Sequence, residues 1–328
     1  MKAIVIDEFG GPEKLICRDV EKPVAGPGEV LVKNVYIGVG KPDYLIRSGR
    51  CHSYTKLPPN LIVGNECAGI VEAVGEGVEG IAPGNKVSVN NGLECDAYAE
   101  YIVVPERFVT VLPDAFDLKK APGLLNYVAA YALLNYAGRG TEGKSLYIRG
   151  AAGGVGTAII QTALLQGMEV VASGSTEEKV QYLKKTGAQC VFNYMEEDEK
   201  EVILKYTDGR GVDLVYDQIA GEHFKSQYEY LAEFGMIVLY NWMQGDPQLD
   251  LDTIVKEAWK AHAVRSFSLH IFDEKPEIIG EIRRICVERL LKGELEPCIT
   301  AILPLEEARK AHELLDAGKI IGKMLLQP

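Results

Sequence analysis

The sequence predicts an α/β protein in which a doubly wound parallel sheet is inserted into a β-rich domain. Residues 1–120 are expected to form short strands, because apolar runs are separated by turns of Gly, Pro, Asn and Asp. From residue 121 onward strands and helices alternate, which is the pattern of a parallel sheet covered on both faces. We expect the strands at 299–304 and 322–326 to return to the first domain.

The second half begins with a helix, since apolar residues recur at helical spacing between Leu124 and Leu134. Beyond it, short apolar runs predict strands, and the more polar segments between them predict helices. The expected strands are 146–149, 169–173, 190–193, 214–217 and 236–240. The expected helices are 158–165, 177–185, 199–207 and 224–233, followed by 276–292 and 305–317.

A glycine-rich turn follows the expected strand 146–149. Its spacing is Ala151-x-Gly153-x-x-Gly156, so an alanine stands at the first glycine of the usual dinucleotide fingerprint. Such a turn lets the backbone approach a pyrophosphate and directs N–H groups at it from a helix N-terminus. A glycine-rich turn of another α/β protein is the alternative, but it does not explain the strands on either side, which complete a βαβ unit. The predicted contacts are Gly153, Gly154, Val155 and Gly156.

Composition excludes several classes of protein. A chain of 328 residues with 47% hydrophobic content can bury the cores of two domains. The net charge of -12 argues against a nucleic-acid partner, because phosphate contacts need clustered Lys and Arg. The chain lacks a run of 18 apolar residues, and its start is typical of a strand rather than a secretory signal, so we expect a cytoplasmic protein. The seven cysteines show no paired spacing and are expected to be reduced thiols.

The end of the second expected parallel strand predicts which dinucleotide binds. NAD sites place an acid there to accept hydrogen bonds from the ribose 2′-OH, but this strand ends with Ser173 and Ser175 and no acid precedes Glu177. Hydroxyls and the nearby Lys179 suit a 2′-phosphate instead. We therefore predict NADPH; in the alternative interpretation, Lys179 is a solvated helix lysine.

At this point the chain resembles the medium-chain dehydrogenase/reductases, in their zinc-independent, quinone oxidoreductase-like group. The segments that carry the resemblance are 38–49 (GVGKPDYLIRSG), 151–156 (AAGGVG) and 318–323 (GKIIGK). The resemblance implies a GroES-like catalytic domain and an inserted Rossmann NADPH-binding domain. It assigns residues 1–123 with 269–328 to the former and 124–268 to the latter, and it suggests a homodimer.

The resemblance also implies further cofactor contacts. Tyr194 joins Lys179 on the 2′-phosphate and adenine side, and Tyr240 with Asn241 approaches the nicotinamide ribose. Arg265 lies where the family's backbone approaches the ring amide. Lys323 reaches the ribose or phosphate side or is a surface lysine, and Ala129 stands where relatives carry a threonine. Tyr194 as a strand-end packing residue is the alternative.

Zinc-dependent members of the family hold the metal with a Cys and a His where this chain has Gly40 and Asn65. We therefore expect no metal, because a tetrahedral site lacks its ligands. An unorthodox site from Cys51, His52, Glu66 and Cys67 is the alternative; the simpler interpretation makes Cys67 a core residue and places the first two on a loop.

Without a metal, the easiest hydride acceptor is conjugated, because its oxygen takes up the arriving charge. By resemblance the active site is bordered by Tyr44, a hydrogen-bond donor, and Lys41, a cation, while Asp43 orients the loop or pairs with Arg47. Tyr44 as a buried supporting aromatic is the alternative. The expected activity is NADPH-dependent reduction of quinones or other conjugated carbonyls, with a 2-enone or enoyl thioester reductase as the rival enzyme. A protein that binds NADPH without turnover is the rival from another class.

Overall fold

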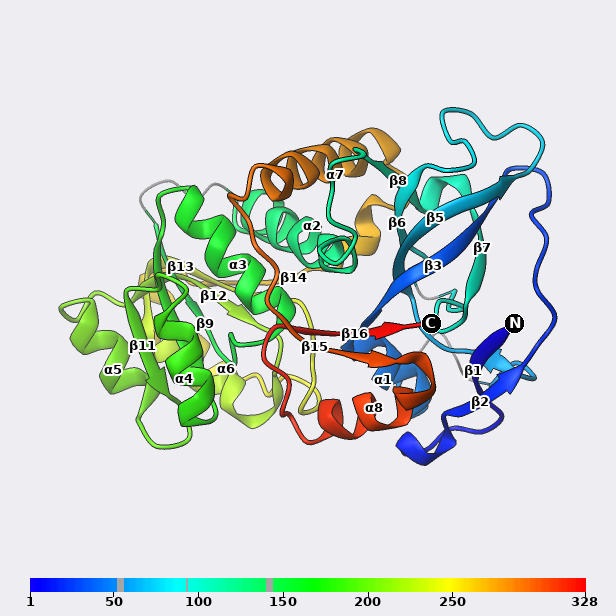
Figure 1. Ribbon diagram of the computed structural model, residues 1–328. Helices are drawn as coiled ribbons and strands as arrows, with labels where there is room; N and C mark the ends of the chain where they lie inside the picture. The colour runs from blue at the N-terminus through cyan, green and yellow to red at the C-terminus, as the bar shows by residue number, and fades with distance from the viewer. Residues whose placement is uncertain (52–55, 93, 140–143) are drawn as a thin grey trace. The chain divides into compact units, whose positions relative to one another are not determined.

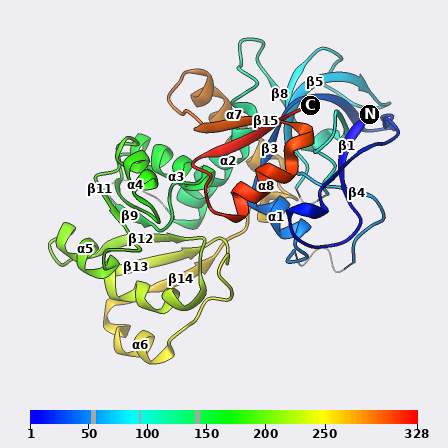
Figure 2. The same ribbon diagram turned by 60° about the horizontal axis from the view of Figure 1, so that its bottom comes forward.

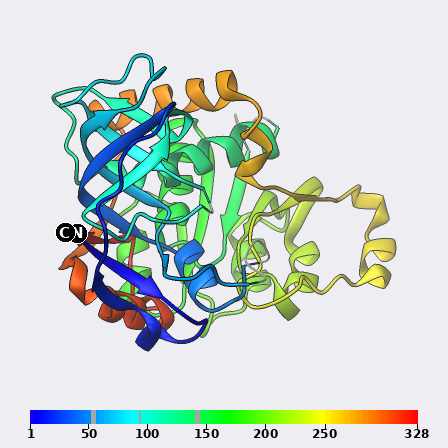
Figure 3. The same cartoon turned by 90° about the vertical axis from the view of Figure 1, so that its right-hand side faces the viewer.

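The computed structural model describes residues 1–51, 56–92, 94–139 and 144–328. The chain divides into two compact units, one formed by 1–125 with 283–328 and the other by 126–282 (Figure 1). The expected return of the tail is confirmed, because both chain termini lie in the first unit (Figure 3). Among the described residues, no helix has the length and apolar content needed to span a bilayer.

The first unit is β-rich, as expected. A three-stranded sheet has the order β2-β1-β4, and a seven-stranded sheet has the order β15-β16-β3-β5-β6-β8 with β7 paired to β3. The strands are β1 (Lys2–Ile6), β2 (Ile16–Asp19), β3 (Glu29–Val39), β4 (Leu61–Ile62), β5 (Glu66–Val74), β6 (Lys86–Asn90), β7 (Tyr101–Pro105), β8 (Val109–Leu112), β15 (Ile299–Pro304) and β16 (Lys323–Gln327). The helices are α1 (Lys41–Arg47) and α8 (Ala308–Asp316), together with most of α7 (Pro276–Leu291).

Two pairings hold the tail of the chain in this unit. The last strand, β16, runs antiparallel to β3, with Leu325 opposite Gly38. Helix α8 packs beside α1, and the two helices lie side by side in Figures 1 and 2. By resemblance the segment 38–49 was expected to be a loop, but its residues 41–47 form the helix α1. It forms because Gly40 is followed by a proline in the first turn and because the Asp43 carboxylate accepts from the Gly40 N–H.

The second unit contains a parallel sheet with the order β11-β10-β9-β12-β13-β14. Its strands are β9 (Ser145–Ile148), β10 (Glu169–Gly174), β11 (Cys190–Asn193), β12 (Val212–Asp217), β13 (Leu231–Leu239) and β14 (Ala263–Ser266). Its helices are α2 (Leu124–Ala132), which continues as a π-helical turn (Leu133–Ala137), α3 (Gly154–Leu165), α4 (Glu177–Lys184), α5 (Glu199–Tyr206) and α6 (Leu251–Lys256). The predicted fold class is thus confirmed, with β9 and β12 meeting where the strand order reverses.

One expectation for this unit is wrong, and one strand was missed. The helix expected at 224–233 is a 3-10 helix, Gly221–Tyr230, after which β13 starts. Phe224, Tyr228 and Tyr230 are buried there, and this aromatic spacing resembles that of a helix. The edge strand β14 was not expected, because its residues are mostly exposed and lack the apolar run of a central strand.

Candidate functional site

The glycine turn between β9 and α3 contains two glycines with different roles. A Cβ on Gly156 would lie 2.3 Å from the Ala151 carbonyl oxygen, so this position admits no side chain unless the turn moves. A Cβ on Gly153 would meet no atom of the described residues within 4 Å. Gly153 precedes the first turn of α3, which Gly154 and Val155 begin. The open space at the N-terminus of α3 is therefore available to a ligand, and backbone N–H groups at a helix N-terminus favour an anionic one.

The carboxyl end of β10 lies next to this turn, since the Ala151 N–H donates to the Ser173 carbonyl at 2.9 Å. The Lys179 ammonium donates to the Ser175 hydroxyl at 3.2 Å. Burial lowers the pKa of Lys179, which is half-buried on α4 rather than fully solvated. The side chain of Ser173 makes a different contact: it is buried, and its hydroxyl is 2.8 Å from the Tyr147 hydroxyl. The Ser173 hydroxyl thus serves the core, and the hydroxyl beside Lys179 is that of Ser175.

Tyr194 follows β11 at the same edge of the sheet, where its N–H donates to the Gly174 carbonyl at 3.1 Å. The Arg149 guanidinium lies over the Tyr194 ring, 4.2 Å from the ring centroid, and forms an ion pair with Glu199. The sequence prediction missed Arg149. Its position directly after β9 was the available signal, because residues that follow parallel strands gather at one edge.

The side chains expected near the nicotinamide come from three elements. Tyr240 follows β13, and its hydroxyl is buried with no hydrogen-bond partner among the described residues. The Asn241 side-chain oxygen accepts from the Trp242 N–H at 2.9 Å. The Arg265 guanidinium donates to the Ala137 carbonyl at 2.6 Å, so it caps the turn that ends α2. Ala129 lies half-buried on α2.

A buried carboxylate that the sequence prediction missed supports the same edge. Asp217, the last residue of β12, accepts from the Ile219 N–H at 2.7 Å and from the Gln227 amide at 2.7 Å. These donors, with His223, hold the pKa of Asp217 below its usual value despite its burial. Asp217 also accepts from the N–H of Ala220, which has a φ of 54° and a ψ of -142°, a backbone conformation strained for any residue except glycine. The carboxylate therefore holds the loop after β12 in place.

In the first unit, α1 presents the two predicted catalytic residues. The Tyr44 ring packs partly against the core, and its hydroxyl accepts from the Arg50 guanidinium at 2.9 Å. The Lys41 ammonium lies 4.8 Å from the centroid of that ring. Of the two roles expected for Asp43, orienting this segment fits its bond from the Gly40 N–H at 2.8 Å. Pairing with Arg47 is wrong, because the Arg47 guanidinium donates to Asp316 at 2.7 Å.

Lys323 forms an ion pair with Glu66, and both side chains are buried, 6% and 5% exposed. The interpretation of Lys323 as a surface lysine is therefore wrong. Its place at the start of β16, next to β3 and close in space to β5, could not be predicted from local sequence.

Comparison with known proteins adds to this geometry. A family model described as "Alcohol dehydrogenase GroES-like domain" matches residues 26–114, and one described as "Zinc-binding dehydrogenase" matches 154–280. The quinone oxidoreductase of Rattus norvegicus is 30% identical over 99% of this chain and 97% of its own length. The chain belongs to the quinone oxidoreductase-like family of medium-chain dehydrogenase/reductases.

Two further members of this family are informative. The 2-haloacrylate reductase of a Burkholderia species is 30% identical over 99% of this chain and 98% of its own length. The crystal structure of Escherichia coli quinone oxidoreductase complexed with NADPH has a TM-score of 0.92 and 27% identity, with both chains fully covered. The chain is accordingly an oxidoreductase that uses a nicotinamide cofactor.

The family's metal positions carry other side chains or none here. Gly40 has no side chain, Asn65 is buried, and the Glu66 carboxylate is engaged by Lys323. Cys67 is a buried core residue, as expected, and burial raises the pKa of its thiol. His52 lies outside the described residues. Within the described ranges, no three His, Cys, Asp or Glu side chains converge on a point that could hold a metal ion. That the enzyme works without zinc stays a prediction.

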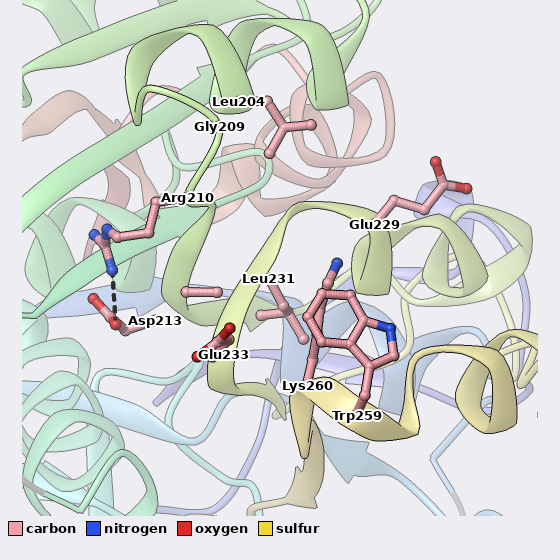
Figure 4. Close-up of a pocket in the computed structure, with 10 residues that line it drawn as sticks. Leu204, Gly209, Arg210, Asp213, Glu229, Leu231, Glu233, Trp259 and Lys260 are labelled. Atoms are coloured by element: carbon pink, nitrogen blue, oxygen red, sulfur yellow. Dashed lines mark hydrogen bonds and ion pairs between the residues drawn. The ribbon is translucent and has the colours of Figure 1, made fainter.

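A pocket of about 410 Å³ lies at the amino ends of β12 and β13, the edge opposite the glycine turn (Figure 4). Four of its five charged lining side chains are already paired. Arg210 contacts Asp213 at 3.0 Å, Glu229 contacts Lys200 at 2.7 Å and Lys260 contacts Glu257 at 2.7 Å. The family's nucleotide site lies at the carboxyl ends of the strands, so this pocket is not the cofactor site.

Proposed function

We propose that this chain is an NADPH-dependent, zinc-independent reductase that transfers hydride to quinones or other conjugated carbonyl acceptors. The observation that carries the cofactor choice is the pairing of Lys179 with Ser175 at the end of β10, where no acid stands to accept from a ribose 2′-OH. A 2′-phosphate would supply the anionic partner that the half-buried ammonium needs. Tyr194, whose ring centroid lies 4.2 Å from the Arg149 guanidinium, would contact the adenine.

The glycine turn would hold the pyrophosphate through the N–H groups of Gly154 and Val155, with Gly153 leaving room for it. Of the remaining predicted contacts, Tyr240 and Asn241 would lie next to the nicotinamide ribose, and the backbone at Arg265 would lie next to the ring amide. Ala129 would line the site but would provide no hydroxyl group. Lys323 would act through Glu66 rather than directly, because the two side chains are paired.

When bound, NADPH supplies the hydride, and the protein has to stabilise charge on the acceptor oxygen and deliver a proton. Tyr44 suits both tasks. Its hydroxyl oxygen accepts from Arg50, which leaves the phenolic proton for a substrate oxygen. Lys41, whose ammonium lies 4.8 Å from the centroid of the Tyr44 ring, would add positive charge where the acceptor oxygen becomes negative.

Replacing Lys179 by alanine is expected to raise the KM for NADPH about tenfold, because one charge-assisted hydrogen bond to the 2′-phosphate is lost. The KM for NADH should not change, since NADH carries no phosphate there. Steady-state kinetics with both cofactors measure this. The exposed Lys184 on the same helix is the matched control, and K184A should behave like the wild type. An equal loss for both cofactors in K179A would contradict NADPH selectivity at this site.

The Tyr44→Phe variant keeps the ring and removes only the hydroxyl, so kcat is expected to fall about tenfold while the stability changes little. The measurement is NADPH oxidation over a panel of quinones, 2-enones and an enoyl thioester. Y36F, on β3 of the same unit, is the control. An unchanged kcat in Y44F would make Tyr44 a packing residue.

The same panel tests the function. Turnover of quinones supports our proposal, whereas preference for an enone or enoyl thioester supports the rival reductase, which the similarity to a 2-haloacrylate reductase favours. Tight NADPH binding with no turnover of any acceptor would make the chain a binding protein.

We further propose a cytoplasmic homodimer, for which the exposed edge strand β14 offers unpaired backbone groups.

A further inference from the structure

A chain of buried hydrogen bonds joins three segments of the first unit that lie far apart in sequence. The Asp43 carboxylate on α1 accepts from the Gly40 N–H at 2.8 Å and from the Tyr98 hydroxyl at 3.1 Å. The same hydroxyl lies 3.1 Å from Nε2 of His312 on α8. All three side chains are 0% exposed, so no bulk water competes with these bonds.

Counting protons shows which group donates in each of these hydrogen bonds. A tyrosine hydroxyl has one proton, and Tyr98 donates it to Asp43. The contact with His312 is then a hydrogen bond only if Nε2 carries a proton and donates it to the Tyr98 oxygen. Burial and the nearby Arg47 lower the pKa of His312 to about 3, so the ring is neutral and Nδ1 carries no proton. That fits Nδ1, which has no hydrogen-bond partner among the described residues.

The Asp43 side chain depends on these donors to remain an ionised carboxylate. Burial and the neighbouring Glu66 raise the pKa of its carboxyl to about 7, while the Gly40 N–H, Lys323 and Tyr98 oppose that rise. These groups face Asp43 from the residue before α1, from β5, from β16 and from the loop before β7. As a carboxylate, Asp43 caps the first turn of α1, the helix that carries Lys41 and Tyr44.

We propose that Tyr98, held by the Nε2–H tautomer of His312, is a positioning residue for the reaction: it directs its proton onto Asp43 and so fixes the turn of α1 that presents Lys41 and Tyr44. This inference rests on the proposed function for its kinetic consequence, but not for its structural one.

The kinetic test is the pH dependence of kcat in the Tyr98→Phe variant. Losing a donor to a carboxylate raises the carboxyl pKa, so less Asp43 is ionised at a given pH and the acid limb of the profile moves to higher pH. We expect a shift of about one unit and a severalfold lower kcat near pH 6.5. D43N should lose this limb altogether, because its side chain does not titrate.

Two variants of α8 separate positioning from packing. H312Q places an amide near the position of Nε2 and should retain a wild-type profile. L315A removes a buried side chain from the same helix without touching the hydrogen-bond chain; it should lower the Tm and leave the profile unchanged. If Y98F loses stability but shows the same profile as L315A, the positioning role is overturned.

The structural test needs no turnover. In protein labelled with 15N-histidine, two-bond 1H–15N correlations distinguish the tautomers of the five histidines, and H312Q identifies the signal of His312. We expect a neutral Nε2–H ring at pH 8.5, where Asp43 is ionised. An Nδ1–H ring or an imidazolium would overturn the inference even in an active enzyme. The expected tautomer in a protein without reductase activity would leave the hydrogen-bond chain intact and reject the proposed function alone.

Discussion

The Lys323→Met variant is expected to have a free energy of unfolding about 3–5 kcal/mol lower than that of the wild type, because the substitution leaves the Glu66 carboxylate buried without its cation. Both partners are almost fully enclosed, and the second carboxylate oxygen of Glu66 has no hydrogen-bond partner among the described residues. Asp43 adds a second buried carboxyl group nearby. Equilibrium denaturation, followed by circular dichroism, measures the loss.

The double variant E66Q/K323M provides the decisive comparison. Removing both charges should restore most of the stability, since a buried ion pair replaced by neutral groups is often neutral in its effect. Lys319 is exposed a few residues earlier, and K319M should not alter the free energy of unfolding. A K323M protein as stable as K319M would show that Glu66 takes up a proton or finds another partner.

The two glycines of the turn are expected to respond in opposite ways to alanine. G156A should lose about 1–3 kcal/mol of stability, because the new methyl group meets the Ala151 backbone and α3 has to move away from the turn. Thermal unfolding, monitored without cofactor, measures this effect. A Tm equal to that of the wild type would contradict the close approach seen here.

G153A should fold with nearly unchanged stability, since its methyl group enters open space and the backbone at this position is extended. Its Kd for NADPH should nevertheless rise about a hundredfold, or about 2.7 kcal/mol, because that space is where the pyrophosphate has to approach. Cofactor fluorescence titration compares it with the wild type. Unchanged affinity would move the cofactor away from this turn.

Local pattern was sufficient for much of the second unit. The sequences of β9, β10 and β11 are short apolar runs, and the glycine turn lies between β9 and α3. Hydrophobic periodicity and the turn residues therefore predict these elements one after another. The edge strand β14 escaped prediction because an exposed strand carries no apolar pattern. The 3-10 helix, Gly221–Tyr230, was mistaken for an α-helix because its buried aromatics have helical spacing.

The candidate site was only partly predictable. The pairing of Lys179 with Ser175 could be anticipated, because the two residues are four positions apart and a helix begins between them. The role of Ser173 could not, because its hydroxyl binds Tyr147 on the neighbouring strand. Whether a hydroxyl faces a ligand or the core depends on which strands become neighbours.

The sequence by itself determined the fold class, the glycine turn and the absence of an acid after β10, because each depends on residues that are close together in the chain. Only the tertiary structure decided that Lys323 pairs with Glu66, Arg47 with Asp316, and His312 with Tyr98. The partners in each pair are more than 200 residues apart. They meet because β16 and α8 return to β3 and α1, and burying a charged or polar side chain without a partner costs free energy.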